Sequence, residues 1–309
     1  MSKIKNYLSL VKFSHTIFAM PFALIGFFLG VRNLKEVPPV LYYRLANLTV
    51  FEKSIFFFSH RWWLLILVIL CMIFARSAAM AFNRWLDKNF DAKNPRTAVR
   101  EIPAGVIKST NALFFVIANC VLFITCCFFI NKICFYLSPV ALFVVLFYSY
   151  TKRFTALCHL VLGVGLSLAP IGAYLAVTGQ FTFLPILLSF TVLFWVSGFD
   201  IIYALQDEEF DKSNQLHSIP AAMGKSKALM VSNLLHVLSA VCVISAGFYG
   251  HFGLWYWIGV AIFCGLLIYQ HTLVKPNDLR KVNMAFFTTN GIASVVFAIF
   301  VILDLFVNG

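Results

Sequence analysis

Eight of the twelve acidic residues in this 309-residue chain lie in two short polar segments. The first segment reads NRWLDKNFDAKNPRTAVREIPAG and covers residues 83–105. The second reads DIIYALQDEEFDKSNQLHSIPAAMG and covers residues 200–224. Each segment begins at the end of a long apolar stretch, where clustered acids are costly unless they serve a function.

In the first segment, Asn83, Asp87 and Asp91 are spaced four residues apart. On a helix this spacing places an amide oxygen and two carboxylates on one face. Like charges at this spacing repel each other, so the pattern predicts a bound cation. Oxygen ligands without His or Cys suit Mg²⁺, which usually shares its coordination shell with phosphate oxygens.

In the second segment, Asp200, Asp207 and Asp211 also share a face if the segment is helical. Glu208 and Glu209 point elsewhere on such a helix, and we expect them to face water. Glu208 is the better candidate of the two to join the metal shell. The two segments therefore predict two acidic faces that bind metal.

Basic residues near these acids can bind phosphate. Arg96 and Arg100 follow the first pair of aspartates, and Lys152 and Arg153 follow Tyr148 at the end of another apolar stretch. Guanidinium groups bind phosphate oxygens in pairs, and ammonium groups bind them as point charges. Acids for a metal combined with cations for a diphosphate predict phosphate chemistry.

The elements that must position these groups are membrane helices. The chain is 61% hydrophobic and 12% charged, whereas soluble domains carry about 25% charged residues. Nine apolar stretches approach the roughly 20 residues that a membrane-spanning helix needs. They cover approximately residues 13–31, 62–82, 112–130, 135–150, 156–177, 183–202, 228–250, 255–274 and 284–307. We therefore predict an all-α polytopic membrane protein with about nine transmembrane helices and polar cap loops.

The basic residues predict the orientation of these helices. If the amino terminus is cytoplasmic, 17 of the 24 Lys and Arg residues lie on the cytoplasmic side, together with both acidic segments. This bias and attraction to the bilayer explain the net charge of +12, so we expect no nucleic-acid partner. No small-residue cleavage site follows the first apolar stretch, and we expect it to remain as a mature helix.

Other features carry less information. Both polar segments contain D-x-x-x-D and IPA, which favours one domain over residues 1–309 with two pseudo-repeats, roughly 1–155 and 156–309. The eight cysteines lie in or beside apolar stretches without zinc-type spacing, and we expect them to pack. His217 fits either a base or a loop-capping residue, and Tyr203 fits either substrate contact or packing.

The two segments resemble the aspartate motifs of the UbiA superfamily of membrane aromatic prenyltransferases. The first matches N-x-x-x-D-x-x-x-D followed by R-T-x-x-R, and the second matches D-x-x-Y-x-x-x-D-x-x-x-D. YSYTKRFT at residues 148–155 is similar to the tyrosine-and-lysine segment after the fourth helix of that family. The resemblance covers nearly the whole chain.

The resemblance implies a nine-helix bundle with a cytoplasmic cap over a cavity that opens sideways to lipid, in a bacterial inner membrane. It also implies two Mg²⁺ ions held by four residues: Asp87, Asp91, Asp207 and Asp211. Asn83 and Asp200 would support these ligands. The diphosphate would be bound by Arg96, Arg100 and Lys152, with Tyr148 and Tyr203 near the allylic carbon or the acceptor.

The expected reaction is electrophilic substitution, in which a polyprenyl diphosphate ionises and the ring of an aromatic acid attacks the allylic carbon. Metal and cations would neutralise the leaving diphosphate in a site that excludes water. The acceptor is 4-hydroxybenzoate by analogy with ubiquinone synthesis, or 1,4-dihydroxy-6-naphthoate in menaquinone synthesis. Precursors of haem, chlorophyll or tocopherol, a non-catalytic lipid-diphosphate binder and a secondary transporter remain alternatives.

Overall fold

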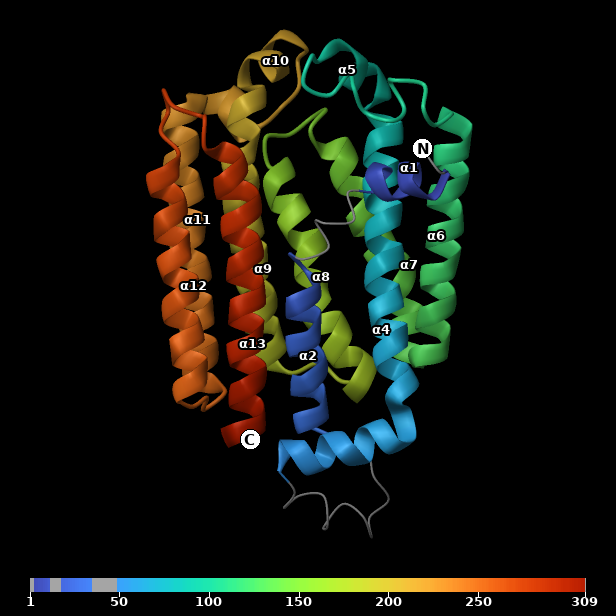
Figure 1. Cartoon of the computed structure of the whole chain (residues 1–309), viewed down its shortest axis with the longest axis vertical. Coiled ribbons are helices and arrows are strands. Elements are labelled where there is room, and N and C mark those ends of the chain that lie inside the picture. Colours follow the sequence, from blue (N-terminus) through green and yellow to red (C-terminus); the bar gives the residue numbers. More distant parts are fainter. Residues whose placement is uncertain (1–2, 12–17, 35–48, 309) are drawn as a thin grey trace.

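The computed structural model of the chain describes residues 3–11, 18–34 and 49–308. Within these ranges the chain forms a bundle of long helices without a β-strand (Figure 1). Eight helices are long and apolar enough to cross a membrane, and a ninth apolar helix has 13 residues. The expected all-α polytopic fold is confirmed.

The described helices follow the chain in a simple order. They are α1 (Lys3–Leu10), α2 (Met20–Arg32), α4 (Val50–Leu86), α5 (Lys88–Lys93), α6 (Ser109–Ile130), α7 (Lys132–Thr151), α8 (Cys158–Thr178), α9 (Phe183–Ala204), α10 (Glu208–Ser213), α11 (Ile219–Tyr249), α12 (Leu254–Leu273) and α13 (Asn290–Asn308). A 3₁₀ turn, Leu205–Asp207, joins α9 to α10, and a π-helical turn, Met284–Thr289, precedes α13.

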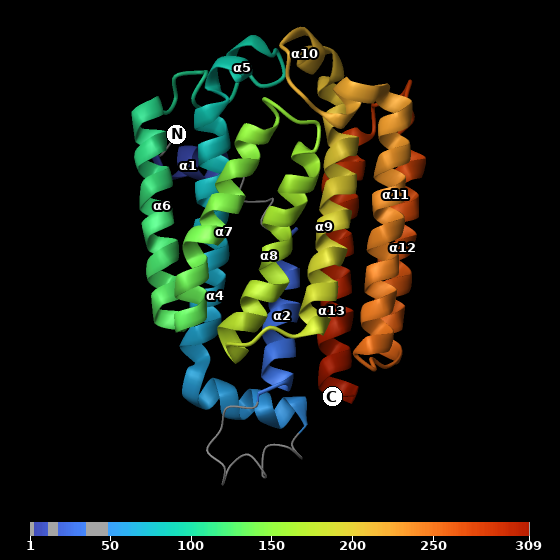
Figure 2. The ribbon, with the colours of Figure 1, turned by 180° about the vertical axis from the view of Figure 1, so that it is seen from behind.

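The nine predicted stretches correspond to α2, α4, α6 to α9 and α11 to α13, although residues 13–17 of the first stretch lie outside the described residues. The predicted start of the second stretch at residue 62 matches the kink at Arg61, after which the long part of α4 begins, although α4 as a whole begins at Val50. A capping box formed by Thr49 and Glu52 starts this helix earlier. The helix bends at Arg61, and the part before the bend lies across one end of the bundle (Figures 1 and 2).

The seventh stretch, predicted to start at about residue 228, corresponds to the part of α11 that follows a kink at Gly224. α11 begins at Ile219, where the Ser218 hydroxyl accepts a hydrogen bond from the backbone N–H of Ala221. The helix then kinks at Gly224, whose φ of 78° is open to glycine without strain. Part of the second polar segment is therefore helical.

α9, on which the second polar segment begins, packs in the middle of the bundle. α9 lies between α8 and α11, and α2 packs against α8 on the other side. A Cβ atom at Gly26 of α2 would collide with the carbonyl oxygen of Pro170 in α8, so glycine permits this close approach. Trp195 of α9 is fully buried and donates a hydrogen bond to Asn290 of α13. These contacts fix α8 against α2 and α9 against α13.

The two short helices α5 and α10 lie side by side at one end of the bundle and form a cap in both views (Figures 1 and 2). α5 follows α4 directly, and α10 follows α9 through the 3₁₀ turn. The carboxyl terminus lies at the opposite end (Figure 1). The fold therefore brings the two polar segments, which are more than 100 residues apart in sequence, to the same end of the molecule.

Candidate active site

The first acidic segment keeps its predicted spacing through a break between two helices. α4 ends at Leu86, and Asp87 joins it to α5 with φ −90° and ψ 5°. The helical hydrogen bonds continue across this break, because Asp87 N–H donates to the carbonyl of Asn83 and Asp91 N–H donates to that of Asp87. The Asn83 side chain also donates to Asp87 Oδ2 at 3.1 Å. Asn83 thus orients the Asp87 carboxylate.

The second segment is divided between three elements rather than lying on one continuous helix. Asp200 belongs to α9, Asp207 ends the 3₁₀ turn, and Asp211 lies in α10. Ser218 holds Asp211 from the start of α11, with its hydroxyl donating to Oδ2 at 2.9 Å. The 3₁₀ turn separates α9 from α10, and all three aspartates still line one cavity.

A cavity of about 290 Å³ lies beneath the cap. Every site residue predicted from the sequence lines this cavity: Asn83, Asp87, Asp91, Arg96, Arg100, Tyr148, Lys152, Asp200, Tyr203, Asp207 and Asp211. The structure therefore brings together residues from the ends of α4, α7 and α9 and from both cap helices. Their individual roles are taken up below as proposals.

Four of the aspartates form ion pairs with cations around the cavity. Within the first segment, Arg100 Nη1 lies 2.7 Å from Asp91 Oδ1. Between the segments, Arg96 binds Asp207 with two nitrogens, one of which is Nε at 3.1 Å from Oδ1. Arg96 also donates to the Tyr203 hydroxyl at 2.9 Å and lies over the ring. The first acidic segment is thus linked directly to the second.

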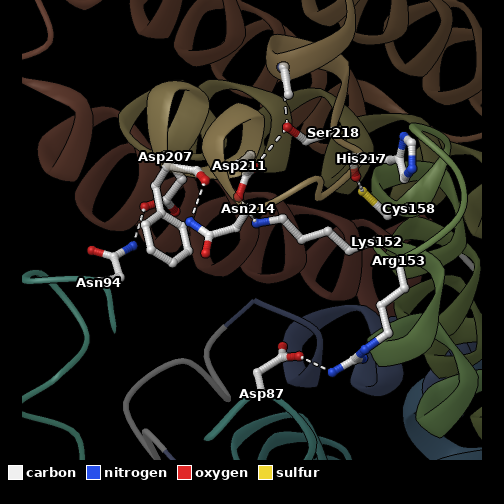
Figure 3. Close-up of polar contacts among 12 residues, drawn as sticks. Asp87, Asn94, Lys152, Arg153, Cys158, Asp207, Asp211, Asn214, His217 and Ser218 are labelled. Atoms are coloured by element: carbon white, nitrogen blue, oxygen red, sulfur yellow. Dashed lines mark hydrogen bonds and ion pairs between the residues drawn. The ribbon is translucent and has the colours of Figure 1, made fainter. Parts of the chain in front are cut away.

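Lys152 and Arg153, adjacent at the end of α7, connect the same two segments (Figure 3). Lys152 Nζ lies 2.7 Å from Asp211 Oδ1, and Arg153 Nη2 lies 2.9 Å from Asp87 Oδ1. Figure 3 shows the two side chains pointing to opposite sides of the site, with Asn94 donating to Asp207 nearby. Charge is balanced locally across the cavity.

Burial and charge shift the titration of groups at the cap. Burial raises the pKa of the Asp87 carboxyl to about 6, although the Arg153 cation acts in the opposite direction. Burial alone would lower the pKa of Lys152, but the neighbouring Asp211 carboxylate outweighs it, and the pKa is raised. At Arg96, the attraction of the Asp207 carboxylate likewise outweighs the effect of burial, and the pKa of the Arg96 guanidinium is raised. Both cations therefore stay charged near neutral pH.

The donor atoms of the cavity fit a hard divalent cation that is shared with phosphate. The acidic ligands offer only oxygen atoms, and Asp91 Oδ2 is buried without a hydrogen-bond partner among the described residues. No group of three or more His, Cys, Asp or Glu side chains in the described ranges converges on a single metal position. Mg²⁺ typically takes one or two carboxylates and completes its shell with substrate phosphates. The carboxylates of the cavity therefore suit a Mg²⁺ ion that is shared with a substrate phosphate.

The less certain residues of the second segment lie away from the cavity. The expectation that Glu208 faces water is wrong, because the residue is buried, pairs with Lys212 at 2.6 Å and lies 3.9 Å from Lys225. The side chain of Glu209 is exposed, as expected. The side chain of His217 is exposed as well, while its backbone N–H donates to the carbonyl of Lys152 at 2.7 Å. This contact favours a loop-fixing role for His217 over a role as a base.

A second, apolar chamber of about 390 Å³ adjoins the polar cavity. It lies mainly between α4, α7 and α8, and small residues such as Gly165, Gly172 and Ala169 form part of its wall. The two spaces share five lining residues: Arg76, Met80, Tyr148, Leu162 and Leu166. The eight cysteines are free thiols, and Cys71, Cys127 and Cys134 line this chamber.

Arg76, Arg153 and His159 also line the polar cavity. The sequence pattern places Arg153 in a basic pair with Lys152 and gives no signal for His159. His159 Nδ1 lies 2.7 Å from Asp200 Oδ2. An isolated arginine within a predicted membrane helix is itself a signal of a functional site, and it could have identified Arg76.

Comparisons with known proteins agree with this geometry. The chain is 30% identical over 236 residues to a 4-hydroxybenzoate octaprenyltransferase of Tolumonas auensis, covering 76% of this chain and 82% of that one. A protein of the same name from Nitrosospira multiformis is 29% identical over 235 residues, covering 76% and 81%.

Two solved structures share the fold. A UbiA homolog from Aeropyrum pernix K1 is 26% identical, with a TM-score of 0.77 over 94% of this chain and 98% of that one. A UbiA homolog from Archaeoglobus fulgidus bound to GPP and Mg²⁺ is 17% identical, with a TM-score of 0.68 over 97% and 99%.

The sequence profile of the UbiA prenyltransferase family matches residues 57–292, which is most of the chain and includes both aspartate segments. The protein is accordingly an enzyme rather than a secondary transporter, as its motifs predict. The match joins the helical bundle, the capped cavity and the paired motifs in one conclusion: this chain belongs to the UbiA prenyltransferase family and is a membrane-embedded aromatic prenyltransferase.

Proposed function

We propose that this protein transfers a polyprenyl group from polyprenyl diphosphate to the ring of an aromatic acid in quinone biosynthesis, with Mg²⁺ as cofactor. One observation carries the proposal: a cavity lined by four ion-paired aspartates adjoins an apolar chamber, and the two spaces share part of their lining. The named relatives act on 4-hydroxybenzoate. The Archaeoglobus homolog bound to GPP and Mg²⁺ supports the donor and the metal.

The polar cavity would bind the diphosphate. Four aspartates are the proposed metal ligands: Asp87, Asp91, Asp207 and Asp211. When bound, Mg²⁺ would neutralise charge on the leaving diphosphate. Arg96, Arg100 and Lys152 already contact these carboxylates, and they are placed to bind phosphate oxygens instead. We add Arg153, which contacts Asp87, to this set.

The apolar chamber would hold the prenyl tail. Its lining is almost entirely aliphatic, aromatic or sulfur-containing, so water gains little by entering it. When the allylic C–O bond breaks, its electron pair leaves with the diphosphate, and a ring carbon of the acceptor supplies the pair for the new C–C bond. Excluding water keeps it from capturing the cation. Tyr148 lies in the wall shared by both spaces, and in this proposal it would lie beside the reacting carbon.

Arg76 favours an acceptor that carries a carboxylate. It lies within the membrane-spanning part of α4, and its Nε atom is buried without a hydrogen-bond partner among the described residues. A cation at such a position requires an anionic partner. Because Arg76 lines both spaces, an acid bound there would present its ring at their junction. We therefore assign the acceptor carboxylate to Arg76.

The same proposal places the cap on the cytoplasmic side of a bacterial inner membrane, with the amino terminus cytoplasmic, as the positive-inside bias predicts. It treats residues 1–309 as one domain of two pseudo-repeats. Each repeat would contribute one aspartate segment to the shared cavity.

The deciding experiment is transfer by the purified full chain in detergent. A radiolabelled all-trans polyprenyl diphosphate is offered with 4-hydroxybenzoate or 1,4-dihydroxy-6-naphthoate, with and without Mg²⁺. We expect Mg²⁺-dependent product with 4-hydroxybenzoate. If product forms only with 1,4-dihydroxy-6-naphthoate, the acceptor is the naphthoate and the reaction belongs to menaquinone synthesis. Mg²⁺-dependent diphosphate binding without product would contradict both acceptors, and no binding would overturn the donor assignment.

A further inference from the structure

Asp200 differs from the other four aspartates of the cavity in its partner. Asp87, Asp91, Asp207 and Asp211 each pair with an arginine or a lysine. Asp200 pairs instead with His159, whose Nδ1 lies 2.7 Å from Oδ2. Both residues line the polar cavity. A carboxylate held by an imidazole rather than by a fixed cation is suited to proton transfer.

The surrounding helices fix the orientation of His159. The residue lies in the first turn of α8 and is only 3% exposed. Its Nε2 accepts a long hydrogen bond from the backbone N–H of Ile219, at 3.4 Å, where α11 begins. A ring nitrogen that accepts carries no proton, so this contact assigns the proton to Nδ1, which donates to Asp200. The imidazole therefore connects Asp200 to the backbone of α11.

The second oxygen of Asp200 remains available to a ligand. Oδ1 makes no hydrogen bond or ion pair with the described residues, and the carboxylate lines the cavity. Asp200 lines the same cavity as Arg76 and Tyr148, which mark the boundary between the polar and apolar spaces. The free oxygen therefore lies in the part of the site where the proposed function places the acceptor ring.

We propose that His159 is a positioning residue that orients Asp200, so that Asp200 Oδ1 accepts the proton lost by the acceptor ring. This inference rests on the proposed function. After the new C–C bond forms, the substituted ring carbon still carries its hydrogen. The C–H electron pair returns to the ring and restores aromaticity, and the proton passes to Asp200. Without its imidazole partner, the carboxylate rotates away from the ring, and proton loss slows.

The test compares two variants of His159 in the full-length protein. His159→Leu removes the donor to Asp200, whereas His159→Asn keeps an N–H group near the position of Nδ1. We expect His159→Leu to lower kcat by about 10- to 100-fold, the scale for loss of an outer hydrogen-bond partner, and His159→Asn to recover most of it. Asp200→Asn should cost about 10²- to 10⁴-fold. Mg²⁺-dependent binding of polyprenyl diphosphate should be unchanged in both His159 variants.

An acceptor deuterated at the attacked ring carbon separates this role from a structural one. With wild-type protein we expect no isotope effect on kcat, because proton loss follows the slow ionisation. With His159→Leu the effect should rise above unity, because proton loss becomes limiting. His217→Leu, a change at an exposed histidine, serves as the control and should show neither change.

Three outcomes would overturn the inference. The first is an unchanged kcat without an isotope effect in His159→Leu, as expected if the diphosphate itself takes the proton. The second is a parallel loss of kcat and diphosphate binding in His159→Leu and His159→Asn alike, which indicates a structural role. The third is a wild-type protein that binds the diphosphate but transfers no prenyl group to either acid, which overturns the proposed function and this inference with it.

Discussion

The polar cavity and the apolar chamber share a wall but are built on opposite principles. In the cavity, side chains from distant parts of the sequence meet in ion pairs, such as Arg96 with Asp207 and Arg153 with Asp87. The chamber is lined by small and aliphatic residues without charged side chains other than Arg76 at its junction with the cavity. The strength of an ion pair depends on the exact positions of its atoms, whereas the free energy of apolar binding depends mainly on the area that is buried. Chemistry and tail binding can therefore be changed separately.

Removing a carboxylate from the cavity should have the largest effect. We expect Asp207→Asn to lower the transfer rate by about 10²- to 10³-fold or more, the scale for losing one preorganised charge, and to weaken Mg²⁺-dependent diphosphate binding. Glu208→Gln is the matched control, because Glu208 pairs with Lys212 away from the cavity. Equal rates for wild type and Asp207→Asn would remove the metal assignment.

A change at the shared wall should affect only the acceptor. Arg76→Met should raise the KM for the aromatic acid by about 10- to 100-fold, because a charge-assisted hydrogen bond contributes roughly 1.5 to 3 kcal/mol. The diphosphate Kd should stay the same. Arg84→Met is the control on the same helix, since Arg84 is already paired with Glu101 at 3.2 Å. It should lower thermal stability and leave the KM for the acid unchanged.

A substitution in the apolar chamber should change the preferred length of the prenyl tail without changing diphosphate binding in the polar cavity. A Cβ atom at Gly172 would meet no atom within 4 Å, so a larger side chain can extend from this wall. We expect Gly172→Phe to lower kcat/KM for a long prenyl tail relative to a short one by about tenfold. Mg²⁺-dependent binding of inorganic pyrophosphate should be unaffected.

Gly265 offers a matched control on α12. A Cβ atom there also meets nothing within 4 Å, and the residue lines neither space. If Gly265→Phe shifted the preference as far as Gly172→Phe, the tail would not lie in the chamber.

The smallest effect should come from pH. Because the pKa of Asp87 is raised to about 6, this ligand is ionised above pH 7 and becomes protonated as the pH falls through 6. Metal ligands must be deprotonated, so Mg²⁺ affinity should fall in the same range, by about fourfold from pH 7.5 to pH 5.5. The measurement is the Mg²⁺ concentration at half-maximal diphosphate binding. Free pyrophosphate with Mg²⁺ but no protein corrects for titration of the ligand.

Much of the architecture could be predicted from sequence because its signals are local. Each apolar stretch predicts one helix without reference to the rest of the chain. The helical spacing of Asp87 and Asp91 is also retained, because backbone hydrogen bonds continue across the break between α4 and α5. The helical segments before the kinks at Arg61 and Gly224, which the prediction lacked, have local causes as well. The Thr49 capping box and the Ser218 cap begin α4 and α11 within segments that read as polar loops.

The partners of the acids could not be predicted, because they depend on how helices pack. His159 meets Asp200 only because α8 lies against α9, and nothing in the sequence near either residue records that contact. The ion pair between Arg84 and Glu101 depends on a turn of the chain after α5. Arg76 differs from these, since a single charge in an apolar stretch was visible from the start.

The end of α7 carries a constraint on insertions and deletions. Lys152 and Arg153 are consecutive, yet they bind Asp211 and Asp87 on opposite sides of the site (Figure 3). One residue added within the last turn of α7 would rotate both by about 100° around the helix axis and break both contacts together. The pair opens the short connection to α8, which covers residues 152–157. Natural variation in chain length should therefore occur beyond Arg153 and be absent from the turn before it.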